Sequence, residues 1–269
     1  MKKTLAILVA LGFALQFSAC TSQGFQGSQG SHQMIKGSKN LITKTIAVPD
    51  FSAIQAHQCI QVIIADSLTD RITVKADDNI MDYVVITATN GILDLSIAPK
   101  INGLNNVTIE VTVPNNGHIN RLEAHSSAGI IAQSLITAPN FEMVSHSSAS
   151  IKGRFKTTSC SMESHSSSEI DVELNTDKAF INLQSSAEID INGSARYCKA
   201  DLSSSSELNA KNFRVENYQI TTSSSADADI NCTTKLVANA SSSSSITYTG
   251  GCSQIESSKS SAASISSAQ

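Results

Sequence analysis

The side chains best able to do chemistry in this chain are carboxylates that recur at a fixed spacing. Six of the seven form pairs two residues apart, Glu207 stands alone, and successive copies lie 19 or 20 residues apart. The seven carboxylates are Glu169, Asp171, Glu188, Asp190, Glu207, Asp227 and Asp229. Hard cations such as Ca²⁺ prefer several oxygen ligands, so these residues could form a calcium site. The simpler interpretation is a solvated acidic face, because a flat sheet supplies few ligands per ion and no calcium-loop motif is present.

Three histidines share a second repeated position. His125, His146 and His165 each open a run of small residues. Imidazoles stacked one above another could bind a transition metal near neutral pH. The distance between neighbouring repeats is longer than the distance between two histidine ligands of one tetrahedral ion. We therefore favour an outward ladder of stacked rings. Protonation of such a ladder below about pH 6 is mutually unfavourable.

The cysteines allow one disulfide between neighbouring repeats. No Cys-x-x-Cys pair occurs, which argues against a zinc site or a thioredoxin-like motif. Cys160 and Cys198 stand two repeats apart, roughly 9.6 Å, which is too far to bridge. Cys232 and Cys252 stand about one repeat apart and could pair. Five cysteines follow Cys20, so at least one of these five has no partner among the others.

The elements that must position these side chains are repeats. Each copy is a run of small residues closed by an apolar one, and the closing residues lie 18 to 21 residues apart. They are Ile130, Ile151, Ile170, Ile189, Leu208, Ala228, Ile246 and Ile265. Every second position within a copy is apolar or small, which indicates parallel strands stacked in register. We predict an all-β parallel β-helix with about 19 residues per rung, whose small residues one and three after the histidine position face inward at a sharp bend.

The N-terminus has the composition of an export signal. Lys2, Lys3 and the apolar stretch that follows predict a signal peptide over residues 1–19. Its last residues resemble a bacterial lipobox, so we expect Cys20 to carry a lipid; the alternative is an ordinary secretory peptide cut near Ala19. No other segment could cross a bilayer.

The rest of the chain divides into three parts. Gly, Ser and Gln over residues 20–40 predict a flexible linker behind the lipid. Residues 41–116 are predicted to be a β-strand-rich part that caps the β-helix. Residues 117–269 hold the repeats, and 41–269 is expected to be one continuous domain.

Composition argues against several functions. The net charge of −4 and pI near 5.8 exclude the basic stripes of a nucleic-acid binder, and 4% aromatic residues leave few stacking platforms. The catalytic motifs Gly-x-Ser-x-Gly and His-Glu-x-x-His are absent. Several pairs of carboxylates could equally well have the separation that the two catalytic carboxyl groups of a glycosidase need. The agreement in distance therefore does not indicate an enzyme. We predict that the chain is not an enzyme; the alternative is a polysaccharide lyase or hydrolase on a β-helix scaffold.

Several segments of the chain resemble the head GIN domain family, described as putative auto-transporter adhesins and common in lipoproteins of Bacteroidetes. The segments are Val48–Ile54, Ile60–Val62, Ile72–Ile80 and Asn90–Leu93. The resemblance covers roughly residues 43–265, with serine at bends where the family often has glycine. It implies a right-handed β-helix and attachment to the cell surface, and it supplies no catalytic residues.

These observations predict an exported, lipid-anchored protein of the cell envelope, with the outer membrane favoured. Its role is expected to be binding or structural and adhesin-like, with a repetitive face presented to a polysaccharide or to an envelope or host protein. We expect no cofactor and no nucleic acid, with Ca²⁺ at the carboxylates as the one alternative. A role in envelope stress without an external ligand is a further alternative. The sequence leaves the oligomeric state and the ligand open.

Overall fold

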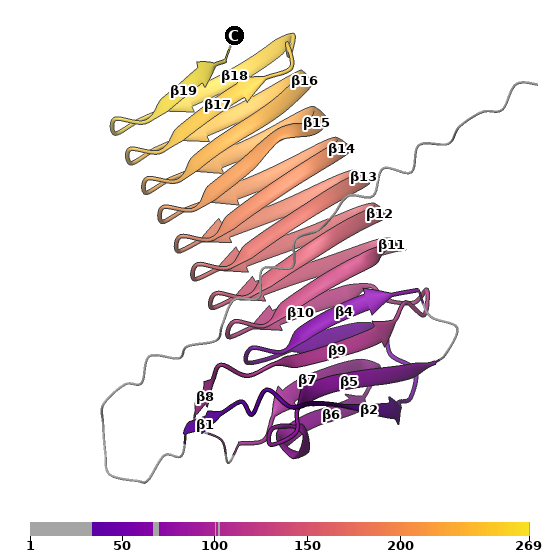
Figure 1. Cartoon of the computed structure of the whole chain (residues 1–269). Coiled ribbons are helices and arrows are strands. Elements are labelled where there is room, and N and C mark those ends of the chain that lie inside the picture. Colours follow the sequence, from indigo (N-terminus) through magenta and orange to yellow (C-terminus); the bar gives the residue numbers. More distant parts are fainter. Residues whose placement is uncertain (1–33, 67–69, 100, 102, 269) are drawn as a thin grey trace, which may run out of the picture.

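The protein is almost entirely β-strand. The structure, a computed structural model, describes residues 34–66, 70–99, 101 and 103–268. In these ranges the one helical element is the 3-10 turn η1 (Met81–Tyr83), and no described helix is long and apolar enough to span a bilayer. The strands pile into a solenoid of about eight turns with about 19 residues per turn (Figure 1). The predicted all-β solenoid is confirmed.

Strands of the repeat region follow one another along the stack. They are β10 (Arg121–His125), β11 (Gly129–His146), β12 (Ser150–His165), β13 (Glu169–Gln184), β14 (Glu188–Leu202), β15 (Glu207–Thr222), β16 (Asp227–Ala240), β17 (Ser245–Thr249), β18 (Gln254–Lys259) and β19 (Ser264–Ser267). From β10 to β16 each strand pairs in parallel with the next. Ile151 therefore lies beside Ile170, and Ile170 beside Ile189, as the repeats predict.

Each long strand bends into two straight segments, which we call legs, and both legs line one narrow core. In β13 the buried residues alternate twice, with a change of phase between the two runs. They are Ile170, Val172 and Leu174, then Ala179, Ile181 and Leu183. Because alternate side chains point to opposite faces of a strand, the change of phase marks a corner at residues 175–178. The solenoid thus has two sheets, with aliphatic columns between them and two outward faces.

A two-residue turn joins the legs at the other end of each rung. After His165 the turn residues are Ser166 (φ 58°) and Ser167 (φ 59°), and two positive φ values recur at this place in the later rungs. Two positive φ values are typical of the type I′ turn, which strains most L residues. The Ser167 amide donates to the Ser185 carbonyl at 3.0 Å, and most rungs repeat this bond, so the turns stack as the strands do.

Only one of the two small positions at the bend faces inward. The residue three after the histidine position is buried, as at Ala149 and Ser168. The residue one after it, such as Ser166, is exposed, so the prediction that it packs inward is wrong. The reason is the turn itself, because two left-handed residues reverse the chain and interrupt the alternation. Ser168 Oγ lies 2.7 Å from the Ser145 carbonyl and 2.8 Å from the His165 carbonyl, so its single hydrogen has an acceptor in either direction and the buried hydroxyl is satisfied.

The solenoid begins earlier than the serine repeats. Strands β3 (Ala53–Ala56) and β4 (Gln61–Ala65) form a rung that pairs in parallel with β10 and β11. On its other side this rung pairs in parallel with β7 (Ile92–Ile97) and β9 (Ile109–Pro114). Gln58 (φ 43°) and Cys59 (φ 45°) form the same turn without its serines. Part of the predicted cap is therefore solenoid.

Antiparallel strands close the N-terminal end. Strand β2 (Leu41–Ala47) pairs with β5 (Arg71–Asp77), and β5 pairs with β9. Strand β6 (Val84–Thr89) pairs with β7 across a turn at Asn90 and Gly91. These antiparallel strands cover the backbone edge of the rung formed by β7 and β9. Without them that edge would be open to pairing with other strands.

Folding starts before the predicted boundary at residue 41. Strand β1 (Met34–Lys36) pairs in parallel with β8 (Gly103–Asn105). The Lys39 amide donates to Asp77 Oδ1 at 2.6 Å, and Asn40 Nδ2 donates to Asp78 Oδ2 at 2.7 Å. Residues 34–40 thus belong to the fold and not to the predicted linker. The predicted signal peptide, Cys20 and residues 21–33 lie outside the described residues.

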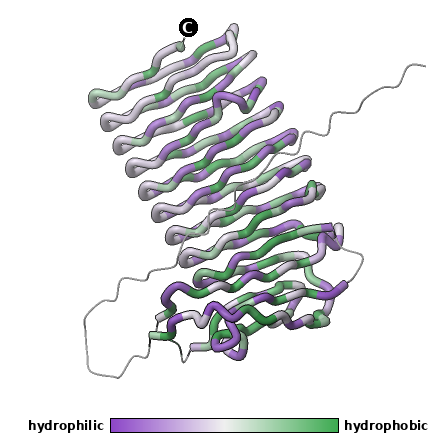
Figure 2. Tube along the Cα trace, in the orientation of Figure 1, coloured by the Kyte–Doolittle hydropathy of each residue, from purple (hydrophilic) through white to green (hydrophobic). Residues whose placement is uncertain are grey.

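The two ends of the stack differ in polarity. Figure 2 shows apolar residues concentrated near the N-terminal end, while the last rungs are paler. In the last rung Ile255 is 44% exposed, and an exposed lysine, Lys259, stands beside the buried Ala240 in an inward column. An inward-pointing charge on an edge strand disfavours the addition of another strand.

Candidate functional site

The structure brings the seven predicted carboxylates together on one sheet, and we call them the acidic columns. Glu188 lies between Glu169 and Glu207, and Asp190 beside Asp171. Asp227 continues the first column after Glu207. Burial, and then the charges of neighbouring carboxylates, raise the pKa of Glu188. The columns therefore carry the mutual repulsion expected of like charges in register.

Basic and amide groups at the borders relieve this repulsion. Lys152 Nζ lies 2.6 Å from Glu169 Oε1 and 3.5 Å from Asp171 Oδ2. Burial lowers the pKa of Lys152, but the hydrogen bonds and charges of these two carboxylates outweigh it and raise that pKa. At the other border Lys211 Nζ lies 3.0 Å from Asp229 Oδ2. No three His, Cys, Asp or Glu side chains of the described ranges are placed to hold a metal ion.

The effect of Lys152 can be separated from that of a cation. We expect millimolar Ca²⁺ to leave the Tm of the wild type unchanged, because a flat sheet supplies too few converging oxygen ligands and no three ligand side chains of the described ranges meet. Lys152→Met should lower stability by about 1 kcal/mol, since it leaves two paired carboxylates without a counter-charge. Thermal melts with Ca²⁺ or a chelator would check both points. A rise in wild-type Tm with Ca²⁺, reversed by chelation, would contradict the first.

A second set of side chains stacks beside the turns, and we call it the histidine column. The ring centroids of His57 and His125 lie 5.1 Å apart, those of His125 and His146 5.3 Å, and those of His146 and His165 4.8 Å. The planes are within 8° of parallel. Because the nitrogen lone pairs lie in these planes, they run side by side and do not converge on one ion. The sequence missed His57, whose turn lacks the serines.

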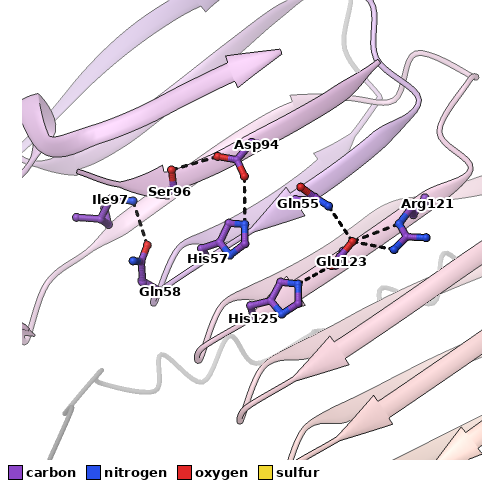
Figure 3. Close-up of polar contacts among 9 residues, drawn as sticks. All are labelled: Gln55, His57, Gln58, Asp94, Ser96, Ile97, Arg121, Glu123 and His125. Carbon is purple, nitrogen blue, oxygen red and sulfur yellow. Dashed lines mark hydrogen bonds and ion pairs between the residues drawn. The ribbon is translucent and has the colours of Figure 1, made fainter. Parts of the chain in front are cut away.

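Carboxylates adjoin one end of the histidine column (Figure 3). His57 Nε2 lies 3.1 Å from Asp94 Oδ2, and His125 Nε2 lies 2.7 Å from Glu123 Oε1. Burial raises the pKa of Glu123, but hydrogen bonds from Gln55, His125 and Arg121 outweigh it and lower that pKa to about 2. Glu123 is therefore ionised, and its hydrogen bond with Gln55 links the β3–β4 rung to β10 of the following rung.

The middle of the histidine column disfavours charge. Burial, and then the charges of His165 and His125, lower the pKa of His146. Glu123 and Glu163 act in the opposite direction but do not offset these effects. His146 is therefore held in its neutral form more strongly than a free imidazole.

A shallow hollow of about 470 Å³ lies beside His57. It is lined by His57, Gln58, Val85, Asp94, Ser96, Ile97, Pro99 and Ser126. Asp94 Oδ1 accepts a hydrogen bond from Ser96 Oγ at 3.1 Å, and Gln58 Oε1 accepts one from the Ile97 amide at 3.1 Å. These polar groups already hydrogen-bond to one another. They link the turn at Gln58 to β7 of the neighbouring rung.

Cys232 and Cys252, which the sequence leaves open as a disulfide, do not form one. Cys160, Cys198, Cys232 and Cys252 are all thiols. Cys232 points into the core and donates to the Lys235 carbonyl at 3.1 Å, while Cys252 follows β17 in an irregular segment. Burial, with the neighbouring Cys252, raises the pKa of Cys232 to about 11. Burial raises the pKa of Cys160 and of Cys198 to about 12, so these thiols are weak nucleophiles.

The sheet opposite the acidic columns carries an aromatic pair, Phe180 and Tyr197. Phe180 on β13 is 38% exposed, and its ring centroid lies 6.3 Å from that of Tyr197 on β14, at 62°. Tyr197 Oη donates to Gln219 Oε1 at 3.1 Å. Sequence reasoning missed this pair because it considered only the total aromatic content. The alternation of inward and outward residues in the leg that ends at Gln184 places Phe180 on the outward face, and this signal could have identified the pair.

Comparison with solved structures shows where else this architecture occurs. A putative adhesin from Parabacteroides merdae is 20% identical, with a TM-score of 0.80 over 88% of this chain and 99% of that one. A putative adhesin from Parabacteroides distasonis is 18% identical (TM-score 0.80; 88% and 100%), and a putative lipid binding protein from the same species is 20% identical (0.79; 88% and 100%). At these identities the likeness shows the fold alone.

The sequence itself matches a family model. No curated protein matches the chain. Residues 50–252 match the model described as "Putative auto-transporter adhesin, head GIN domain". This match covers well over half of the chain, from the first parallel rung to the segment after β17. The resemblance seen in the sequence is confirmed, and the chain belongs to the head GIN domain family.

Proposed function

We propose that this protein is a lipid-anchored protein of the cell envelope that binds an extended ligand in an adhesin-like way. The observation that carries the proposal is the register of the two outward faces. Glu169, Glu188 and Glu207 stand in line on one face, and equivalent positions line up on the other. A rung spacing of about 4.8 Å repeats each contact along the stack. A repetitive polysaccharide or a long protein surface can then be held by many weak contacts.

The names of the family and of its neighbours support a binding role. The family is described as an adhesin, and so are two of the similar structures. Another similar structure is called a lipid binding protein. For this chain the hollow beside His57 offers little support for a buried acyl chain, because it is open to solvent and Asp94 and Gln58 lie beside its apolar residues Val85, Ile97 and Pro99. An external ligand on the flat faces fits the geometry better.

A binding array tests the proposed function. The mature chain, coupled to a multivalent carrier, should bind at least one member of a panel of polysaccharides and matrix proteins. Boiled protein on the same carrier is the control. If no ligand is retained, the adhesin-like role is wrong. Release of reducing or unsaturated sugar ends from the panel would instead support the alternative, a polysaccharide hydrolase or lyase.

Attachment through Cys20 predicts a second result. Cys20→Ala should move the protein from the detergent phase to the aqueous phase, because one lost acyl anchor removes about 0.8 kcal/mol of membrane affinity per buried CH₂. Cys252→Ala, which changes a different cysteine, should stay in the detergent phase. Detergent-phase partitioning of cell extracts measures both. If Cys20→Ala partitions like the wild type, Cys20 is not the site of lipid attachment.

A further inference from the structure

We propose that the aromatic pair, Phe180 and Tyr197, is a stacking platform for a neutral, extended polysaccharide. This inference rests on the proposed binding function and narrows its ligand to one class. The pair lies on outward positions of β13 and β14, on the sheet opposite the acidic columns. Its two rings come from neighbouring rungs, in which Ala179 lies beside Cys198.

Exposure distinguishes Phe180 from the other phenylalanines of the repeat rungs. Phe141, Phe155 and Phe213 are no more than 3% exposed, whereas Phe180 is 38% exposed. Folding does not require an aromatic ring at this outward position. Aromatic side chains enriched at the surface are typical of contact sites, because they offer a large rigid area at small entropic cost.

Polar side chains occupy outward positions on the same strands as the rings or on the next rung. Tyr197 Oη is bound to Gln219 Oε1, and Gln184 Nε2 donates to Asn182 Oδ1 at 3.2 Å. Amides and phenols both donate and accept hydrogen bonds, as sugar hydroxyls do. The C–H face of a pyranose can pack on the exposed ring while its hydroxyls reach these amides. This combination favours a saccharide over a purely apolar partner.

Charge around the platform favours a neutral polymer. Lys199 Nζ lies 3.2 Å from Asp201 Oδ2, and Arg196 Nε lies 3.0 Å from Asp177 Oδ1. The charges compensate within each of these two pairs, and Lys178, the ladder neighbour of Tyr197, adds one exposed positive charge outside them, so the platform has no strong charge of either sign. The acidic columns on the other sheet, with the net charge of −4, disfavour a polyanion.

The spacing of the platform suits a chain that runs along the stack. Successive rungs are about 4.8 Å apart, which is similar to the rise of one sugar in an extended glycan. The two ring centroids, 6.3 Å apart, therefore lie within reach of consecutive sugars. The outward amides of the same rungs continue the row on one side of the rings.

Affinity electrophoresis of the mature chain tests this site. Native gels would contain hydroxyethylcellulose, mixed-linkage β-glucan or galactomannan as neutral probes. We expect retardation by at least one of them, and at least a fivefold loss of apparent affinity in Phe180→Ala and in Tyr197→Ala. Phe180→Tyr should bind like the wild type. Leu135→Ala removes another exposed apolar side chain, 48% exposed on β11, and should also bind like the wild type. Thermal melts would confirm that each variant is folded.

The outcomes separate the platform from the wider binding role. Absence of retardation in all three neutral gels, or unchanged retardation of folded Phe180→Ala, would overturn the platform. If the binding array retains a protein ligand but none of the three gels retards the chain, the platform is overturned while the adhesin-like role stands. Failure of the whole array would remove both.

Discussion

Gly193→Ala is expected to lower the stability of the solenoid by about 3 kcal/mol, which corresponds to roughly 10 °C in Tm. Two effects add at this residue. Gly193 has φ +112°, where L side chains are strained, and it lies directly beside Leu174 in the neighbouring rung. A Cβ here would overlap the Leu174 carbonyl, which is backbone and cannot rotate away. Chemical denaturation of the two proteins measures the difference.

Gly117→Ala is the matched control for this prediction. Gly117 also has a positive φ of 75°, but no heavy atom lies within 4 Å of a Cβ built there. Its substitution should therefore cost only the backbone strain, about 1 kcal/mol. Equal losses in the two variants would show that the close approach of neighbouring rungs at Gly193 does not contribute.

Acid is expected to destabilise the protein in two steps. The pKa of His146 is lowered in the folded state, so the unfolded chain binds this proton first as the pH falls below about 6.5. The pKa of Glu123 is lowered from 4.5 to about 2, so its contribution is present above pH 4.5 and is lost between these two values. That second step is of the order of 3 kcal/mol. Denaturation midpoints measured from pH 8 down to about 2 would show both steps.

Single substitutions assign the two steps to their residues. Glu123→Gln keeps the size of the side chain and should flatten the lower step, although it lowers stability at pH 7. His146→Gln should flatten only the upper step, since it removes the most disfavoured charge of the column. If the pH profiles of both variants run parallel to that of the wild type, neither group controls acid sensitivity.

The difference between prediction and structure is clearest at the first rungs. The strand pair Ala53–Ala56 and Gln61–Ala65 lies between segments that come later in the chain, β7 with β9 on one side and β10 with β11 on the other. Its turn residues, Gln58 and Cys59, adopt the positive φ values of the serine turns without serine. Sequence periodicity cannot detect a rung that has the conformation of the repeat but not its residues.

The local sequence pattern was enough to predict the strand register wherever one face of a leg is buried. Alternation by two, repeated every 19 or so residues, leaves one register that buries Ile151, Ile170 and Ile189 together, because a slip of one residue would expose every core side chain. The same register aligns the carboxylates, so the acidic columns were predictable. It did not determine how Lys152 and Lys211 border them, because side-chain direction at the edge of a cluster depends on its neighbours.

The sequence by itself determined an all-β solenoid, its rung length and which side chains share a column. Tertiary structure alone decided that His57 joins the histidine column, that Cys232 and Cys252 remain thiols and that Phe180 lies exposed beside Tyr197. The physical reason is the range of the interactions. Periodic burial acts within each repeat and is written locally, whereas strand order, thiol placement and ring contacts depend on segments that meet only after the chain has stacked.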